Sequence, residues 1–145
     1  MKNRTRARGW ALQALYAWEQ RGGAPEMAVP VLHELFTNLR VSPQNRPYAE
    51  ILVRLVGTNL AKIDSTIVEA LTNWRMERLA VVDRAILRLG TAEMMFVDDV
   101  PPRLVIREMV QLAEKYGTHE SPRFVNGVLD AVMRRVAPQG ASPRQ

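Results

Sequence analysis

The residues best suited to chemistry are four basic side chains at the N-terminus: Lys2, Arg4, Arg6 and Arg8. No acid precedes Glu19, so this short arm supplies most of the chain's formal net charge of +5. Arginine forms forked hydrogen bonds to phosphate and stacks on nucleobases. An acid-free basic terminus is therefore a common means of binding RNA, and the alternative is a solvated chain end that only aids solubility.

A second candidate site lies near the C-terminus, where Phe124 follows Arg123 and precedes Gly127. On a helical wheel Gly127 falls between the other two, and Phe124 lies at the rim of an apolar stripe. A flat base would stack on Phe124 over the bare backbone of Gly127 and be held by Arg123. The alternative is that Gly127 admits another helix and Phe124 is ordinary core.

Other aromatic and acidic residues raise weaker possibilities. Trp18 lies on the apolar stripe of its helix and is predicted to pack in the core, whereas Tyr16 lies off that stripe and stays a candidate for contact with a base. Glu93 points along an apolar stripe, so it needs hydrogen bonds or a cation. Backbone donors after Pro101 and Pro102 are its preferred partners, because no nucleophile accompanies it or Glu108 as a general acid or base.

Several function classes are excluded by composition. The chain has no cysteine and two histidines, His33 and His119, which are far apart in sequence, so no metal site is expected. No phosphate-binding glycine motif or esterase motif occurs, so neither a cofactor nor a catalytic residue is assigned. Charges interrupt every apolar stretch before it reaches membrane-spanning length. No membrane contact and a cytoplasmic location are therefore expected.

The elements that must position these residues are helices. Apolar residues repeat with a period of 3.6, no strand candidate is found, and the chain is predicted to be all-α with about six to seven helices. The expected stretches are 4–20, 25–39, 48–72, 79–97, 102–116 and 121–136. Gly22 and Gly23 should end the first, Gly57 or residues 64–65 should interrupt the third, and Ser121 should cap the last.

These helices suggest one compact domain over residues 1–136, built from two subdomains. The N-terminal bundle is expected at about 4–73 and the C-terminal bundle at about 74–136, with Trp74 in the joint between them. Residues 137–145 are expected to form a disordered tail. Arg134, Arg135 and Arg144 add a second basic end, so the excess charge is assigned to the two ends of the chain.

Four segments together resemble the NusB family of transcription antitermination factors. They are Arg8-x-x-Ala-Leu-Gln-Ala-Leu-Tyr-Ala-Trp18, Asp83-Arg-Ala-Ile-Leu-Arg-Leu, Val100-Pro-Pro with Glu108, and Phe124-Val-Asn-Gly-Val-Leu-Asp130. They occur in order with suitable spacing between residues 4 and 136. The last segment is the most specific of the four.

The resemblance implies a fold of two helical bundles that binds the boxA segment of nascent ribosomal RNA leaders as a single strand. It implies assembly with NusE, a small-subunit ribosomal protein, within the transcription elongation complex, so that RNA polymerase passes terminators. This is a binding function without catalysis. The residues assigned to RNA are Lys2, Arg4, Arg6, Arg8, Tyr16, Glu120, Arg123, Phe124 and Gly127, with Glu120 accepting from a base edge. Asp83, taken as an exposed acid, is assigned to the NusE surface.

Two alternatives stay open from the sequence. One is a stand-alone version of the NusB-like RNA-recognition domain that precedes the catalytic region of certain ribosomal RNA cytosine methyltransferases. The other is a helical adaptor that assembles with proteins, including a second copy of itself in a homodimer, and does not bind RNA.

Overall fold

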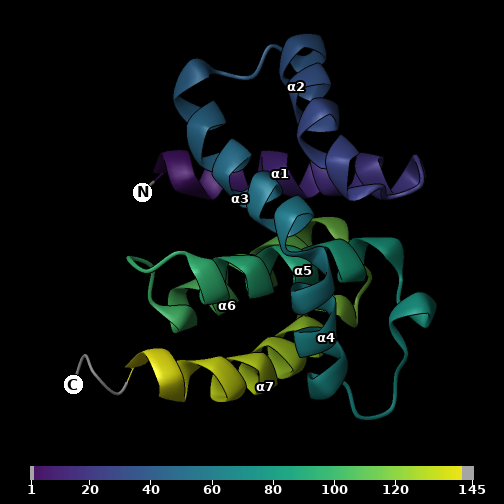
Figure 1. Cartoon of the computed structure of the whole chain (residues 1–145), viewed down its shortest axis with the longest axis vertical. Coiled ribbons are helices and arrows are strands. Elements are labelled where there is room, and N and C mark those ends of the chain that lie inside the picture. The colour runs from purple at the N-terminus through teal and green to yellow at the C-terminus, as the bar shows by residue number, and fades with distance from the viewer. Residues whose placement is uncertain (1, 142–145) are drawn as a thin grey trace. The chain divides into compact units, whose positions relative to one another are not determined.

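The computed structural model describes residues 2–141, and every regular element in that range is a helix (Figure 1). The predicted all-α class is confirmed. The α-helices are α1 (Lys2–Gln20), α2 (Ala28–Leu39), α3 (Arg46–Thr58), α4 (Leu60–Ala70), α5 (Val81–Phe96), α6 (Pro102–Tyr116) and α7 (Ser121–Ala141). Short 3₁₀ helices occupy Pro25–Met27, Pro43–Asn45 and Met76–Arg78.

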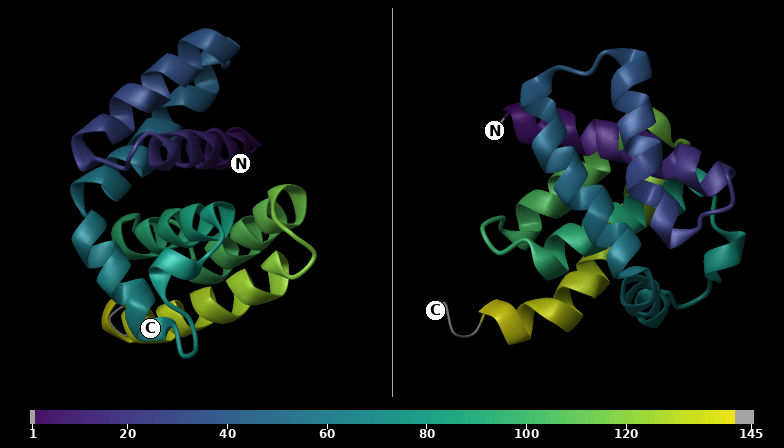
Figure 2. Two further views of the ribbon diagram at one scale, coloured as in Figure 1. Left: turned by 90° about the vertical axis from the view of Figure 1, so that its right-hand side faces the viewer. Right: turned by 45° about the horizontal axis from the view of Figure 1, so that its top comes forward.

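The chain forms two compact units, which divide between Leu60 and Ala61. In the first unit, α1, α2 and α3 contact one another in all three pairs (Figure 2). The buried positions of α1 recur at helical spacing and include alanines, which permit close helix packing: Ala7, Ala11, Ala14, Leu15 and Trp18. The predicted core position of Trp18 is confirmed, and its indole N–H donates to the Ala24 carbonyl at 2.7 Å.

The second unit is built on α5, α6 and α7, which also contact one another pairwise. Gly90 of α5 allows the close approach, because a Cβ at this position would lie 2.8 Å from Met109 Cγ of α6 and 3.0 Å from Leu129 Cδ1 of α7. Helix α4 is joined to α5 by an ion pair between Asp64 and Arg88. The two carboxylate oxygens of Asp64 accept two hydrogen bonds from the Arg88 guanidinium, each 2.9 Å long. Such a paired geometry fixes orientation as well as adding attraction.

The long predicted helix at 48–72 is two helices. The break falls at Asn59, between α3 and α4, and not at Gly57 or residues 64–65, which are helical. Asn59 leaves the helical conformation at φ −117° and ψ 26°, and its side-chain amide donates to the Leu55 carbonyl at 3.0 Å. An asparagine that satisfies the end of a helix with its own side chain competes with continued helix, which explains the position of the break.

The ends of α1 and α7 differ in how well the sequence predicted them. Helix α1 ends at Gln20, and Gly22 and Gly23 adopt φ values of 106° and 68°, as the predicted stop requires. Helix α7 extends to Ala141, beyond the expected end at residue 136, so the expected tail begins too early; residues 142–145 lie outside the described range. The joint expected at 73–78 is a connection within the second unit.

Candidate nucleic-acid interface

The basic N-terminal arm is helical, because α1 begins at Lys2. Its cations divide into two pairs with a spacing of four residues, which places each pair on one helix face. Lys2 and Arg6 are exposed, whereas Arg4 is half-buried and Arg8 is buried, with 3% of its surface exposed. The four predicted phosphate contacts are therefore not equivalent.

Tyr48 explains the difference between the two pairs. The guanidinium carbon of Arg4 lies 4.3 Å from the centre of the Tyr48 ring, and that of Arg8 lies 5.6 Å from it. Tyr48 is itself buried in the first turn of α3, so α1 and α3 of the first unit are joined by cations on a ring face. The assignment of Arg8 as a phosphate contact does not fit this burial, and Arg8 is a packing residue in this structure.

The exposed pair shares one face of α1 with an aromatic residue farther along the helix. At 100° per residue, Lys2, Arg6 and Tyr16 fall within about 80° of one another on the helix surface. Tyr16 is 40% exposed, so its position off the core stripe is as predicted from the sequence. One face of α1 thus presents two cations and one ring to solvent.

The start of α7 carries the second candidate site. The carbonyl of Glu120 accepts the first helical hydrogen bond, from the N–H of Phe124 at 3.1 Å, so Glu120 and not Ser121 occupies the N-cap position. Ser121 is buried, and its hydroxyl accepts from the N–H of Thr118 at 2.9 Å. Glu120 and Arg123 are both exposed at this end of the helix.

Gly127 lies one turn farther along α7 and is exposed. A Cβ built on it would meet no atom within 4 Å, so no helix of the second unit requires a glycine here. Within the second unit, nothing supports the alternative interpretation in which Gly127 admits another helix. The bare backbone beside Arg123 and Phe124 is open to a ligand.

Phe124 is half-buried and has a partner that the sequence did not reveal. Its ring packs against the ring of Trp74, with centroids 5.9 Å apart and ring planes at 72°. This is the edge-to-face arrangement that aromatic pairs prefer. The two rings are about 50 positions apart in sequence, so there was no local signal from which the contact could have been found.

The basic residues near the end of α7 are engaged within the second unit. Arg134 pairs with Asp130 at 2.7 Å, and Arg135 donates to the Glu69 carbonyl in the last turn of α4. A cation at the C-terminal end of a helix satisfies a free carbonyl and complements the helix dipole. Arg135 therefore joins α7 to α4, whereas Arg134 pairs within α7, and Arg144 lies outside the described residues.

Two acids differ in how far the structure supports their expected setting. Asp83 is half-buried in the first turn of α5, so its description as an exposed acid is wrong. Its Oδ1 is buried and has no hydrogen-bond partner in the described structure. Glu93 is fully buried, as its position on an apolar stripe predicted.

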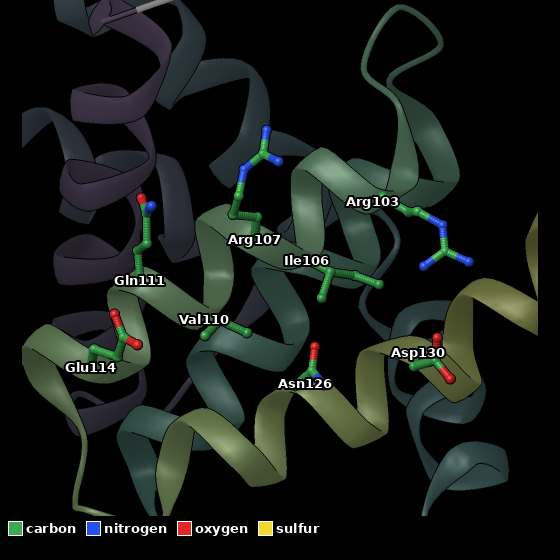
Figure 3. A pocket seen from close by; sticks show the side chains of 8 residues that line it. All are labelled: Arg103, Ile106, Arg107, Val110, Gln111, Glu114, Asn126 and Asp130. Carbon is green, nitrogen blue, oxygen red and sulfur yellow. The ribbon is translucent and has the colours of Figure 1, made fainter.

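A groove between α6 and α7 lies beside Asn126, the residue that precedes Gly127 (Figure 3). It has a volume of about 500 Å³ and carries both signs of charge. Its lining residues are Arg103, Ile106, Arg107, Val110, Gln111, Glu114, Asn126 and Asp130. No signal in the sequence indicated this groove, since it depends on how two helices pack.

A second groove, of about 690 Å³, follows α3 in the first unit. Glu50 lies in it and accepts hydrogen bonds from His33 at 2.9 Å and Arg54 at 2.6 Å. The contact with His33, followed by that with Arg54, lowers the pKa of Glu50 below its ordinary value. Because these charges are satisfied within the unit, this groove offers less free charge to a polyanion than α1 does.

Neither a metal cluster nor a membrane helix is found in residues 2–141. No group of three or more potential ligand side chains is placed to hold a metal ion there. Within the same range, every helix falls short of the length and apolar character that crossing a membrane requires.

The fold and these surfaces define an all-helical protein with exposed cations on α1 and α7, an exposed ring on α1 and a half-buried ring on α7. The chain belongs to the NusB family, whose family model matches residues 5–134. It is 42% identical over 132 residues to the transcription antitermination protein NusB of Sorangium cellulosum, covering 91% of this chain and 92% of that one. It is 40% identical over 144 residues to the protein of the same name from Solibacter usitatus, covering 99% and 97%.

Solved structures agree with this membership. T. maritima NusB superimposes with a TM-score of 0.84 at 35% identity, covering 94% of each chain. A chain from a crystal structure of the antitermination factors NusB and NusE in complex with double-stranded RNA superimposes with a TM-score of 0.83 at 33% identity. That match covers 93% of this chain and 98% of the other.

Proposed function

We propose that the protein is an RNA-binding transcription antitermination factor. It binds boxA-type single-stranded RNA of ribosomal RNA leaders together with the ribosomal protein NusE and promotes read-through by RNA polymerase. The observation that carries this proposal is family membership over nearly the whole chain, joined to a relative solved with NusE and RNA. The function is one of binding in the cytoplasm, with no catalytic step.

On the RNA side, two surfaces support the proposal. Lys2 and Arg6 present free cations on α1, with Tyr16 on the same face, and these suit a phosphate backbone and a base. On α7, Arg123 and the open backbone of Gly127 flank Phe124. The exposed carboxylate of Glu120, at the N-cap, suits a hydrogen bond from the edge of a base.

On the protein side, Asp83 supports contact with NusE. Its buried Oδ1 has no hydrogen-bond partner in the described structure, and leaving such an acceptor unsatisfied costs about 1 to 3 kcal/mol. Because that oxygen is covered, a basic partner would contact the part of Asp83 that stays accessible. The half-buried position gives this residue more weight in a partner interface than a fully solvated acid would have.

The proposal is tested by fluorescence anisotropy with four labelled RNAs: single-stranded boxA, a scrambled strand, and the duplex form of each. Each is titrated with the protein, alone and with purified NusE. We expect single-stranded boxA to bind more tightly than the scrambled strand and both duplexes, with NusE increasing the difference. Equal binding to all four RNAs, unchanged by NusE, would contradict the proposal and favour the adaptor.

A further inference from the structure

Trp74 is the largest side chain that the structure leaves exposed without an assigned role. It lies between α4 and α5, and 57% of its surface is exposed. Exposing so large an aromatic side chain to water is unfavourable. Its ring contacts only part of Phe124, which itself stays half-buried. Exposed rings of this size, where they are not needed for packing, are typical of binding surfaces.

The segment that carries Trp74 is held in place by contacts of its own unit. Arg84 of α5 donates to the carbonyls of Met76 at 2.7 Å and Leu79 at 3.1 Å. The 3₁₀ turn Met76–Arg78 closes the segment on one side, and the hydrogen bond from Arg135 to Glu69 fixes the end of α4 on the other. Trp74 is therefore presented by anchored backbone, which lowers the entropy lost when it binds a ligand.

We propose that Trp74 is a second base-stacking residue, which acts with Phe124 to hold two neighbouring bases of the single-stranded RNA. This inference rests on the proposed function. In an edge-to-face pair, each ring keeps at least one face that the other ring does not cover. Every nucleobase has a face that stacks on such a ring.

The angle between the rings adds a constraint on the RNA. With ring planes at 72°, bases that stack on Trp74 and Phe124 cannot remain stacked on each other. The strand turns between them, which exposes the edges of both bases for hydrogen bonding. Sequence-specific recognition of RNA depends on unstacked bases of this kind.

The surroundings of the two rings favour RNA over a protein partner. Exposed cations follow Trp74 at Arg75 and precede Phe124 at Arg123. Arg75 makes a long, solvent-exposed contact of 3.6 Å to Glu77, which a phosphate can replace at little cost. The open backbone at Gly127 completes a surface with room for a planar base.

The test compares the wild type with Trp74→Ala, Trp74→Phe and the control Leu39→Ala, which removes an equally exposed apolar side chain from the first unit. Affinity for single-stranded boxA is measured by anisotropy, and folding by circular dichroism. Trp74→Ala should weaken binding by about 5- to 160-fold, the effect of one lost stacking contact. Trp74→Phe should retain most of the affinity because it keeps a ring, and Leu39→Ala should have no effect.

Tryptophan fluorescence supplies a second measurement, which would not change on RNA binding if Trp74 had only a structural role. RNA should quench the emission of the wild type more than that of Trp74→Phe, because stacking on a base quenches an exposed indole. Equal quenching in both, with unchanged affinity in Trp74→Ala, would overturn the inference. If Phe124→Ala loses affinity while Trp74→Ala does not, only this inference fails; if the wild type does not bind boxA, the proposed function fails.

Discussion

The start of α1 and the start of α7 combine the same residue types in opposite ways. In α1, two of the four cations lie over the buried Tyr48 ring, and the other two are free. At the start of α7, the ring of Phe124 pairs with that of Trp74 from the α4–α5 connection, and the cation Arg123 stays exposed. In the first region a ring packs against cations, whereas in the second a ring packs against another ring.

This difference implies that the proposed RNA binding has two separable contributions. The proposed contacts from Lys2 and Arg6 to phosphate would release counterions, so their share would depend strongly on salt and little on base sequence. Contacts from the rings depend on stacking, which salt affects much less. Substitutions in the two regions should therefore change different observables.

The largest effect is expected at Phe124. Phe124→Ala should weaken binding of single-stranded boxA by about 1 to 3 kcal/mol through the loss of base stacking. Phe124→Leu, which keeps most of the apolar volume but no ring, is the matched variant and should lose a similar amount while remaining folded. Global unfolding of both variants by circular dichroism would instead identify Phe124 as a core residue.

A change in salt dependence is expected from the free cations of α1. Replacing Lys2 and Arg6 by Ala should reduce the slope of log affinity against log salt by about 1.4, from about 0.7 for each neutralised phosphate on a single strand. The slope of Phe124→Leu should match that of the wild type. If the double variant keeps the wild-type slope, the arm does not contact phosphate.

Tyr48 should affect stability more than salt dependence. Tyr48→Leu removes the ring face beneath Arg4 and Arg8, and each cation on a desolvated ring contributes about 0.5 to 2 kcal/mol. Tyr48→Phe keeps the ring and should unfold closer to the wild-type denaturant midpoint. Equal denaturant midpoints for the two variants would show that the contacts between the cations and this ring do not stabilise the fold.

The sequence predicted the helices well because their apolar spacing is a local property. It placed the end of α1 correctly, since the glycines that follow it adopt the left-handed backbone that the stop requires. It misplaced the break between α3 and α4, because the apolar pattern continues across residue 59. The position of the break is set by a hydrogen bond from the Asn59 side chain. It ended α7 too early, at a point where the apolar stripe fades but the helix continues.

The candidate site was predicted in part for the same reason. The position of Tyr16 off the core stripe followed from the helical period. The burial of Arg8 did not, because it arises from tertiary packing, which includes the Tyr48 ring of another helix. Likewise, the partnership of Phe124 with Trp74 and the open space at Gly127 depend on tertiary packing, which no spacing within one helix reveals.

Gly127 offers the most direct test of the claim that the open start of α7 contacts RNA. Alanine in a helix is favoured over glycine by about 0.5 to 1 kcal/mol, and a Cβ at position 127 meets no atom. Gly9→Ala in α1, where an added Cβ also meets nothing, provides the reference for this gain in stability.

The measurement is the unfolding free energy and the boxA affinity of Gly127→Ala, determined on the same preparation. The account predicts a more stable protein that binds RNA more weakly, because the methyl group occupies the space of the base. A variant that is more stable and binds RNA as tightly as the wild type would contradict it.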